Sequence, residues 1–200
     1  MAAAILITAL ALQSAAPAAD ATASRSEGIA AIALAEAMER GFRACAEQVA
    51  ERKLLSTAND GALAKTGLTL STSPPDEIAM VASTIFRESP LYAEVKSSEG
   101  KVWVIASPDV PACKVTAGDS RDVTLARQAL DGLFAKSTTW SLDKAQSHVK
   151  DGVRRQTYVL NKGKPGPHMI AFIDGPVEIV NDGKGVQAII TVGIQKPEAK

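Results

Sequence analysis

The stretch YAEVKSSEGKVWVIA, residues 92–106, decides the fold class of this chain. Before Pro90 the apolar residues follow a helical period, whereas from residue 92 onward they recur with a period of two. Residues 92–96 and 101–106 flank the turn-forming sequence Ser-Ser-Glu-Gly, so they predict a β-hairpin. The second segment, KVWVIA, is rich in β-branched and aromatic residues, which favour a central strand of a sheet.

Strand patterns continue beyond this hairpin, with one helix between them. Residues 112–116 predict a third strand, and residues 122–136 predict an amphipathic helix. Strand character returns in four further segments, at residues 138–142, 153–160, 168–173 and 186–194. Turns rich in Gly, Asn and Asp join the later segments, which is typical of antiparallel strands.

Upstream of the hairpin, residues 27–52 predict a long amphipathic helix with Ser26 as its N-cap. Ala, Leu, Glu and Arg dominate this segment, and all four are good helix formers. Its apolar residues recur at alternating spacings of three and four and so form one stripe: Ala35, Met38, Phe42, Cys45 and Val49. Residues 60–65 and 75–89 predict two shorter helices.

Together these elements predict an α+β domain. We expect an antiparallel sheet of about six strands, with a long N-terminal helix and a second helix inserted between two groups of strands. The order of elements is similar to that of profilin-like and PAS-like sheets, an analogy that concerns element order alone and carries no functional weight. Residues 22–200 are expected to form this single domain.

Residues 1–21 have the character of a secretory signal peptide that is cleaved. The apolar run at residues 2–12 is shorter than the roughly 20 residues of a membrane span, and small residues follow it. Three Ala-x-Ala sequences, which end at Ala18, Ala21 and Ala23, are candidate cleavage sites. No basic residue precedes Arg25, so an upstream start codon, a weak signal and an alanine-rich disordered tail stay open as alternatives. We expect a periplasmic or secreted protein with no membrane span in its mature form.

Cys45 and Cys113 are the two cysteines of the chain. An even number in an exported chain indicates a disulfide, and their separation of 68 positions excludes a CxxC redox motif. Cys45 lies on the apolar stripe of the predicted helix and Cys113 on a predicted strand, so we expect the bridge to join helix and sheet. Two buried free thiols are the alternative.

Charge is unevenly distributed along the chain, although the formal net charge of zero argues against general nucleic-acid binding. Residues 27–99 contain seven basic and eleven acidic residues, whereas residues 100–200 contain fourteen and ten. Residues 144–164 alone contain six basic side chains and one acid. This segment is either a solvated surface or a contact for an anionic partner.

An anionic envelope component or another exported protein is the expected partner of such a contact. Its candidate residues are Arg154, Arg155, Lys162 and Lys164. Because Arg154 and Arg155 are adjacent on a predicted strand, their side chains are expected to point to opposite faces of the sheet.

Motifs of catalysis and metal binding are not recognisable in the sequence. His148 and His168 are the only histidines, and no P-loop, GxGxxG or GxSxG sequence occurs. We therefore expect no cofactor and interpret the chain as a non-catalytic binding or interaction domain. Two alternatives stay open: a small hydrolase-like enzyme with a dispersed site built around one histidine and a carboxylate, and a structural component of the envelope.

Overall fold

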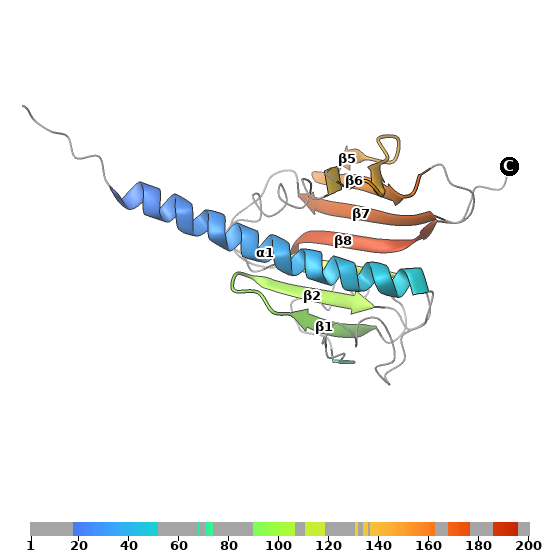
Figure 1. Ribbon diagram of the computed structural model, residues 1–200, viewed down its shortest axis with the longest axis horizontal. Helices are drawn as coiled ribbons and strands as arrows, with labels where there is room; N and C mark the ends of the chain where they lie inside the picture. The colour runs from blue at the N-terminus through green and yellow to red at the C-terminus, as the bar shows by residue number, and fades with distance from the viewer. Residues whose placement is uncertain are drawn as a thin grey trace, which may run out of the picture.

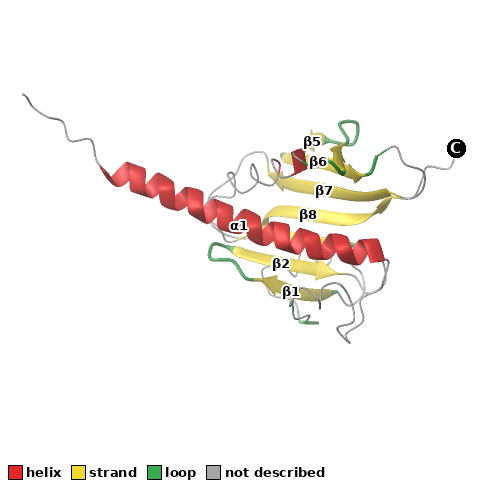
Figure 2. Cartoon of the chain, in the orientation of Figure 1, coloured by secondary structure: helices red, strands yellow, loops and turns green. Residues whose placement is uncertain are grey.

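The computed structural model describes residues 18–51, 68, 71–73, 90–106, 111–118, 131, 134–135, 137–162, 168–176 and 186–195. These residues form one long helix, α1 (Ala18–Glu51), which lies across a single sheet (Figures 1 and 2). The strands are β1 (Leu91–Val95), β2 (Lys101–Ala106), β3 (Cys113–Gly118), β4 (Trp140–Leu142), β5 (His148–Lys150), β6 (Val153–Leu160), β7 (His168–Pro176) and β8 (Val186–Gln195). The α+β class is confirmed in outline, but the prediction of about six strands is wrong, because the described residues form eight.

All neighbouring strands of the sheet are antiparallel, and β8 joins two groups of consecutive strands. The order is β1-β2-β3-β8-β7-β6-β4, and β5 also pairs with β6. β4 and β5 lie beside opposite ends of β6, so the two short strands together form the outer edge of the sheet. The last strand in chain order, β8, lies in the middle of the sheet between β3 and β7.

The helix α1 begins at Ala18 rather than at residue 27, so the prediction of Ser26 as its N-cap is wrong. Alanine, the best helix former, supplies four of the nine residues at 18–26 and extends the helix in this direction. Figure 1 shows this first part of α1 projecting beyond the sheet and the second half lying across the strands. The apolar stripe is confirmed, since Ala35, Met38, Cys45 and Val49 are buried and Phe42 is half-buried.

Seven of the eight strands lie where the sequence predicts them, with their ends shifted by three residues at most. The strand β5 is not predicted, and the turn that follows it explains why it forms. Asp151 and Gly152 join β5 to β6 with φ values of 51° and 72°, the backbone of a two-residue type I′ turn. The Asp-Gly dipeptide is the sequence signal that identifies this hairpin.

The predicted helices at residues 60–65 and 75–89 lie outside the described residues. The predicted second helix, at residues 122–136, lies largely outside them as well. Three of its residues, Asp131, Phe134 and Ala135, are described, and their backbone is helical.

Close packing of α1 on the sheet depends on Gly41. A Cβ atom at this position would lie 3.0 Å from Val115 Cγ1 and 3.3 Å from Val104 Cγ2, so a larger residue would push the helix away. The helix packs on β1, β2, β3 and β8. Their buried residues on the helix side form an aliphatic layer of Ala93, Val95, Val102, Val104, Val115, Ala117, Ala188, Ile190 and Val192. Each buried valine or isoleucine stabilises the fold by roughly 1.5–3 kcal/mol relative to an exposed one.

A disulfide joins α1 to β3, as the sequence predicts. Cys45 and Cys113 are both fully buried, and their Cα atoms lie 5.4 Å apart. Since Gly41 faces Val115 and Cys45 faces Cys113, the helix runs antiparallel to β3. Each step from β3 to β2 and from β2 to β1 reverses direction, so α1 also runs antiparallel to β1.

An aromatic cluster extends the core toward the outer edge of the sheet. Phe42 of α1 lies 4.8 Å from Phe134 and 5.5 Å from Trp140 of β4, measured between ring centroids, with edge-to-face geometry. Phe134 also packs on Tyr158 of β6 at 4.6 Å. Burial is the main cause that raises the pKa of Tyr158, so its hydroxyl stays protonated.

Candidate functional site

A cleft of about 520 Å³ opens between the second half of α1 and the end of β1. Leu68 and Val95 supply its apolar surface. Five charged residues border the rest, with Arg40, Arg43 and Glu47 from α1 and Glu94 and Lys96 from the β1 side. Ligand sites in proteins typically have volumes of roughly 300–1,000 Å³ and combine apolar walls with a few polar groups, so this cleft has the size and composition of one.

Helical spacing places three of these charges in one row. Arg40, Arg43 and Glu47 are three and four residues apart, which puts them on the same side of α1. Arg43 is paired within the helix, because its Nε donates to Glu39 Oε1 at 3.0 Å. Arg40 instead reaches the sheet, and its Nη2 donates to the backbone carbonyl oxygen of Lys96 at 2.8 Å.

The helix wall of the cleft has a positive and a negative end. The Arg40 guanidinium lies beside the Lys96 carbonyl oxygen, whereas Glu47 lies seven residues further along α1, about 10 Å away along the helix axis. Glu94 pairs with Trp103, so its side chain points to the face of the sheet opposite α1. Within the described part of the chain, Arg40 has no carboxylate partner and Glu47 has no cationic one.

The structure places Arg154 and Arg155 on opposite faces of β6, as the sequence predicts. Arg154 lies on the same face as Tyr158, and its Nη2 is 2.7 Å from Asp131 Oδ2. The guanidinium of Arg155 lies over the ring of Phe172, 4.9 Å from its centroid. Each arginine therefore has its own contact within the chain.

Lys162 and Lys164 do not join either arginine. Lys164 lies outside the described residues, and Lys162 follows the end of β6 that is remote from Arg154. The six residue steps from 154 to 160 span about 20 Å of strand, too far for one small anion to contact Arg154 and Lys162 together. Contact of any one of these side chains with an anionic partner stays a prediction.

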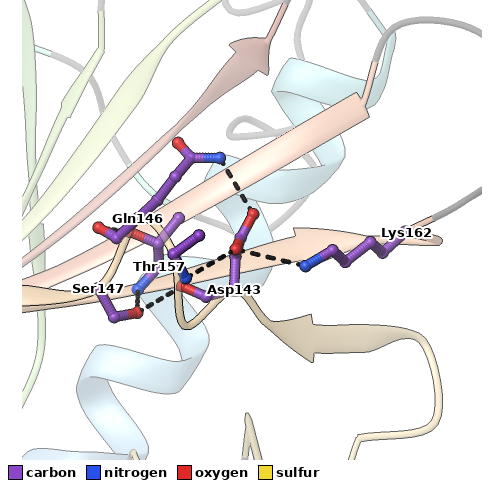
Figure 3. Close-up of polar contacts among 6 residues, drawn as sticks. Asp143, Gln146, Ser147, Thr157 and Lys162 are labelled. Atoms are coloured by element: carbon purple, nitrogen blue, oxygen red, sulfur yellow. Dashed lines mark hydrogen bonds and ion pairs between the residues drawn. The ribbon is translucent and has the colours of Figure 1, made fainter.

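Lys162 belongs to a polar network that holds the loop between β4 and β5 against β6 (Figure 3). Its Nζ lies 3.3 Å from Asp143 Oδ1, and Gln146 Nε2 donates to Asp143 Oδ2 at 3.1 Å. Ser147 Oγ donates to the Asp143 carbonyl oxygen at 2.7 Å and accepts the Thr157 backbone N–H at 3.0 Å. Although burial raises the pKa of Asp143, the hydrogen bonds from Gln146, Lys162 and the Ala145 N–H, together with the Lys162 charge, outweigh it and the pKa is lowered. Lys162 thus contributes to the edge of the sheet.

The two histidines lie apart from the cleft and from each other. His148 begins β5 and is exposed, with Nδ1 3.2 Å from the Gln146 carbonyl oxygen. His168 begins β7 and is half-buried. No group of three metal-ligating side chains occurs among the residues that the structure describes. Within the same residues, no helix has an apolar stretch long enough to cross a bilayer.

Sequence reasoning missed the cleft, although its residues are visible in the pattern. The spacing of Arg40, Arg43 and Glu47 marks one side of a helix, and such a row of charges is equally typical of a solvated surface. The packing of this row beside the end of β1 makes it a wall of the cleft, and the sequence pattern does not contain that information. Comparisons of the chain with protein-family models, with curated proteins and with solved structures found no significant match.

Proposed function

We propose that this protein is an exported, non-catalytic binding domain that takes up its ligand in the cleft between α1 and β1. The observation that carries the proposal is the combination of apolar surface with open charges of both signs. Leu68 and Val95 supply the apolar part, and the open charges are those of Arg40 and Glu47 on α1. A ligand that fits this cleft would bury apolar surface and form charge-assisted hydrogen bonds together.

The α1 wall of the cleft is well anchored. Cys45 lies between Arg43 and Glu47 in the helix, so the disulfide to Cys113 holds this wall at its middle. The hydrogen bond from Arg40 to the Lys96 carbonyl oxygen ties the same wall to the end of β1. A site held in this way loses little conformational freedom on binding, which favours affinity.

Export is the second part of the proposal. It is supported by the apolar run and Ala-x-Ala sequences at residues 1–23, and by a disulfide, which persists in oxidising compartments outside the cytoplasm. Cleavage after Ala18, Ala21 or Ala23 would retain the part of α1 that crosses the sheet, because its described buried residues start at Leu34.

Two other functions have weaker support. A dispersed catalytic site would need a histidine near a carboxylate in a cleft, and His148 and His168 do not line this one. A structural component would need a continuous apolar patch. Leu142, Val149 and Val153 are exposed near the outer edge, but Val153 lies on the other face from Leu142 and Val149.

The test is a ligand screen with the mature protein. Thermal unfolding is measured at low salt with amino acids, short peptides, dicarboxylates, sugar phosphates and oligosaccharides, and each hit is repeated with Arg40→Gln/Lys96→Gln. We expect at least one ligand to raise the Tm of the wild type and to lose this effect in the double variant. Lys150→Gln, an exposed change on β5, is the matched control and should bind like the wild type. Hits that are all unaffected by the double variant, or a screen without hits, would overturn the proposal.

A further inference from the structure

Resting on the proposed function, we infer that the ligand of the cleft is a monocarboxylate with an apolar tail. Its carboxylate pairs with the guanidinium of Arg40, and its tail lies along Leu68 and Val95. This class of ligand is selected by the anchored position of Arg40, by the apolar surface beside it and by Glu47 further along α1.

The guanidinium of Arg40 is held in place by the sheet. Its Nη2 donates to the Lys96 carbonyl oxygen at 2.8 Å, a contact that joins α1 to the end of β1. A guanidinium has five N–H donors, so further donors are available for the two oxygens of a carboxylate. Because the side chain is already positioned by this contact, a carboxylate binds it with a smaller loss of conformational freedom.

Apolar surface begins directly beside this guanidinium. Val95 precedes Lys96 in the chain and belongs to the core beneath α1, and it borders the cleft there. Leu68 is half-buried against the same core and lines the cleft as well. The methylene groups of Arg40 and Arg43 can extend this surface along the helix. An apolar tail attached to the carboxylate would therefore be removed from water as the charge pair forms.

The other charges of the helix wall disfavour a second charge on the ligand. Arg43 is already paired with Glu39. Glu47 lies about 10 Å beyond Arg40 along the helix axis, so it would repel a second carboxylate of the ligand. Glu47 is exposed and, within the described part of the chain, has no contact that positions it, so an ammonium group would gain little from it.

Calorimetric titration at low salt with hexanoate and its neutral analogue hexanamide tests the inference. Hexanoate should bind about tenfold more tightly, because the amide keeps the tail and loses the charge. Pentanoate and butanoate test the tail, and each methylene group that is lost should weaken binding about fourfold where it is fully buried. Hexylammonium, which has the same tail and the opposite charge, should bind more weakly than hexanamide.

Variants of the cleft assign the two parts of the ligand. Arg40→Gln should bind hexanoate and hexanamide equally, whereas Arg40→Lys keeps the charge without the planar fork and should retain part of the preference. Leu68→Ala should weaken the binding of both compounds by the same factor, because it shortens the apolar wall and leaves the charge. Lys150→Gln removes an exposed positive charge on β5, outside the cleft, and is the control that should retain the full preference.

The outcomes separate this inference from the proposed function. The monocarboxylate inference is wrong, and the binding site stands, if hexanoate does not bind or hexanamide binds as well, while a ligand of the screen depends on Arg40. It is also wrong if adipate, or hexanoate with a terminal amino group, binds the cleft more tightly than hexanoate. If no compound of the titration or of the screen depends on Arg40, both proposals are wrong.

Discussion

Two regions along the sheet are stabilised by different means. In the first, α1 covers the strands β1, β2, β3 and β8, and the contact consists of aliphatic side chains around Gly41 and a buried disulfide. In the second, the short strands β4 and β5 form the edge, and a network around Asp143 holds their connecting loop against β6. We call these regions the helix-covered strands and the outer edge.

The stability of the two regions should depend on different solution conditions. Apolar burial and a disulfide are insensitive to pH near neutrality, but the disulfide is lost on reduction. Hydrogen bonds to a carboxylate are insensitive to reduction but weaken when acid protonates the carboxylate. Reductant and acid should therefore act on different parts of this molecule.

Removal of the disulfide should have the largest effect on stability. The double variant Cys45→Ala/Cys113→Ala frees a loop of 68 residues in the unfolded chain, and the free energy of unfolding should fall by about 4 kcal/mol. Denaturant unfolding with and without reductant measures this change. Reductant should destabilise the wild type and leave the double variant unaffected. An equal response of both proteins to reductant would contradict the assignment of the bridge.

Loss of the Asp143 charge should have a smaller effect that depends on pH. Asp143→Asn removes the ion pair with Lys162 and leaves one acceptor oxygen in place of two, and should lower the free energy of unfolding by about 1–2 kcal/mol at pH 7. Asp151→Asn is the control at the same edge, because Asn also suits the type I′ turn.

The lowered pKa of Asp143 fixes the sign of the pH dependence. In the unfolded chain the carboxyl has a pKa of about 3.9 and binds a proton more readily than in the folded protein. Its contribution to stability is therefore complete above that pH. It is lost as the pH falls through the lower pKa of the folded state. When unfolding is measured from pH 7 to pH 2.5, the difference in the free energy of unfolding between the wild type and Asp143→Asn should therefore narrow below about pH 4. A difference that stays constant over this pH range would show that the Asp143 charge is not its cause.

Two threonines allow the same substitution to be compared in both regions, with the smallest expected effects. Thr157 at the outer edge is buried, and its hydroxyl donates to the Gln146 carbonyl oxygen at 3.0 Å. Thr157→Val should therefore lower the free energy of unfolding by about 1 kcal/mol. Thr116 of β3 is equally buried, but its hydroxyl has no hydrogen-bond partner in the described structure. Thr116→Val should therefore leave the stability unchanged or raise it slightly. Equal losses in both variants would mean that the Thr116 hydroxyl is bound to water or a ligand.

Local sequence patterns were sufficient for most of the sheet and for the bridge. The bounds of β2 and β6 agree with the prediction, because both segments contain several β-branched and aromatic residues and turn residues mark their ends. Cys45 was placed inward by the spacing of its neighbours on the helix, which is a purely local property.

Features that depend on distant contacts were not predictable in this way. The strand β5 has three exposed residues and no alternation that would reveal it, so only the Asp-Gly turn identifies it. The cleft needs α1 beside the end of β1, which follows from the register of Gly41 on Val115 and of Cys45 on Cys113. The basic residues at 144–164 are close in sequence, but β6 separates Arg154 and Arg155 by face and Lys162 by distance.

The central position of β8 has a consequence for the order in which the molecule assembles. As the chain emerges from the ribosome or a translocation pore, α1 and β1–β3 appear first, and their disulfide can form before β8 is available. Until β8 inserts, β3 and β7 both present unpaired edges, which are templates for aggregation. Pairing between Cys113 and Val192 joins positions far apart in the chain, and closure of such contacts is slow. The sheet is therefore completed last at its centre, and shielding of these edges during assembly is most important in that interval.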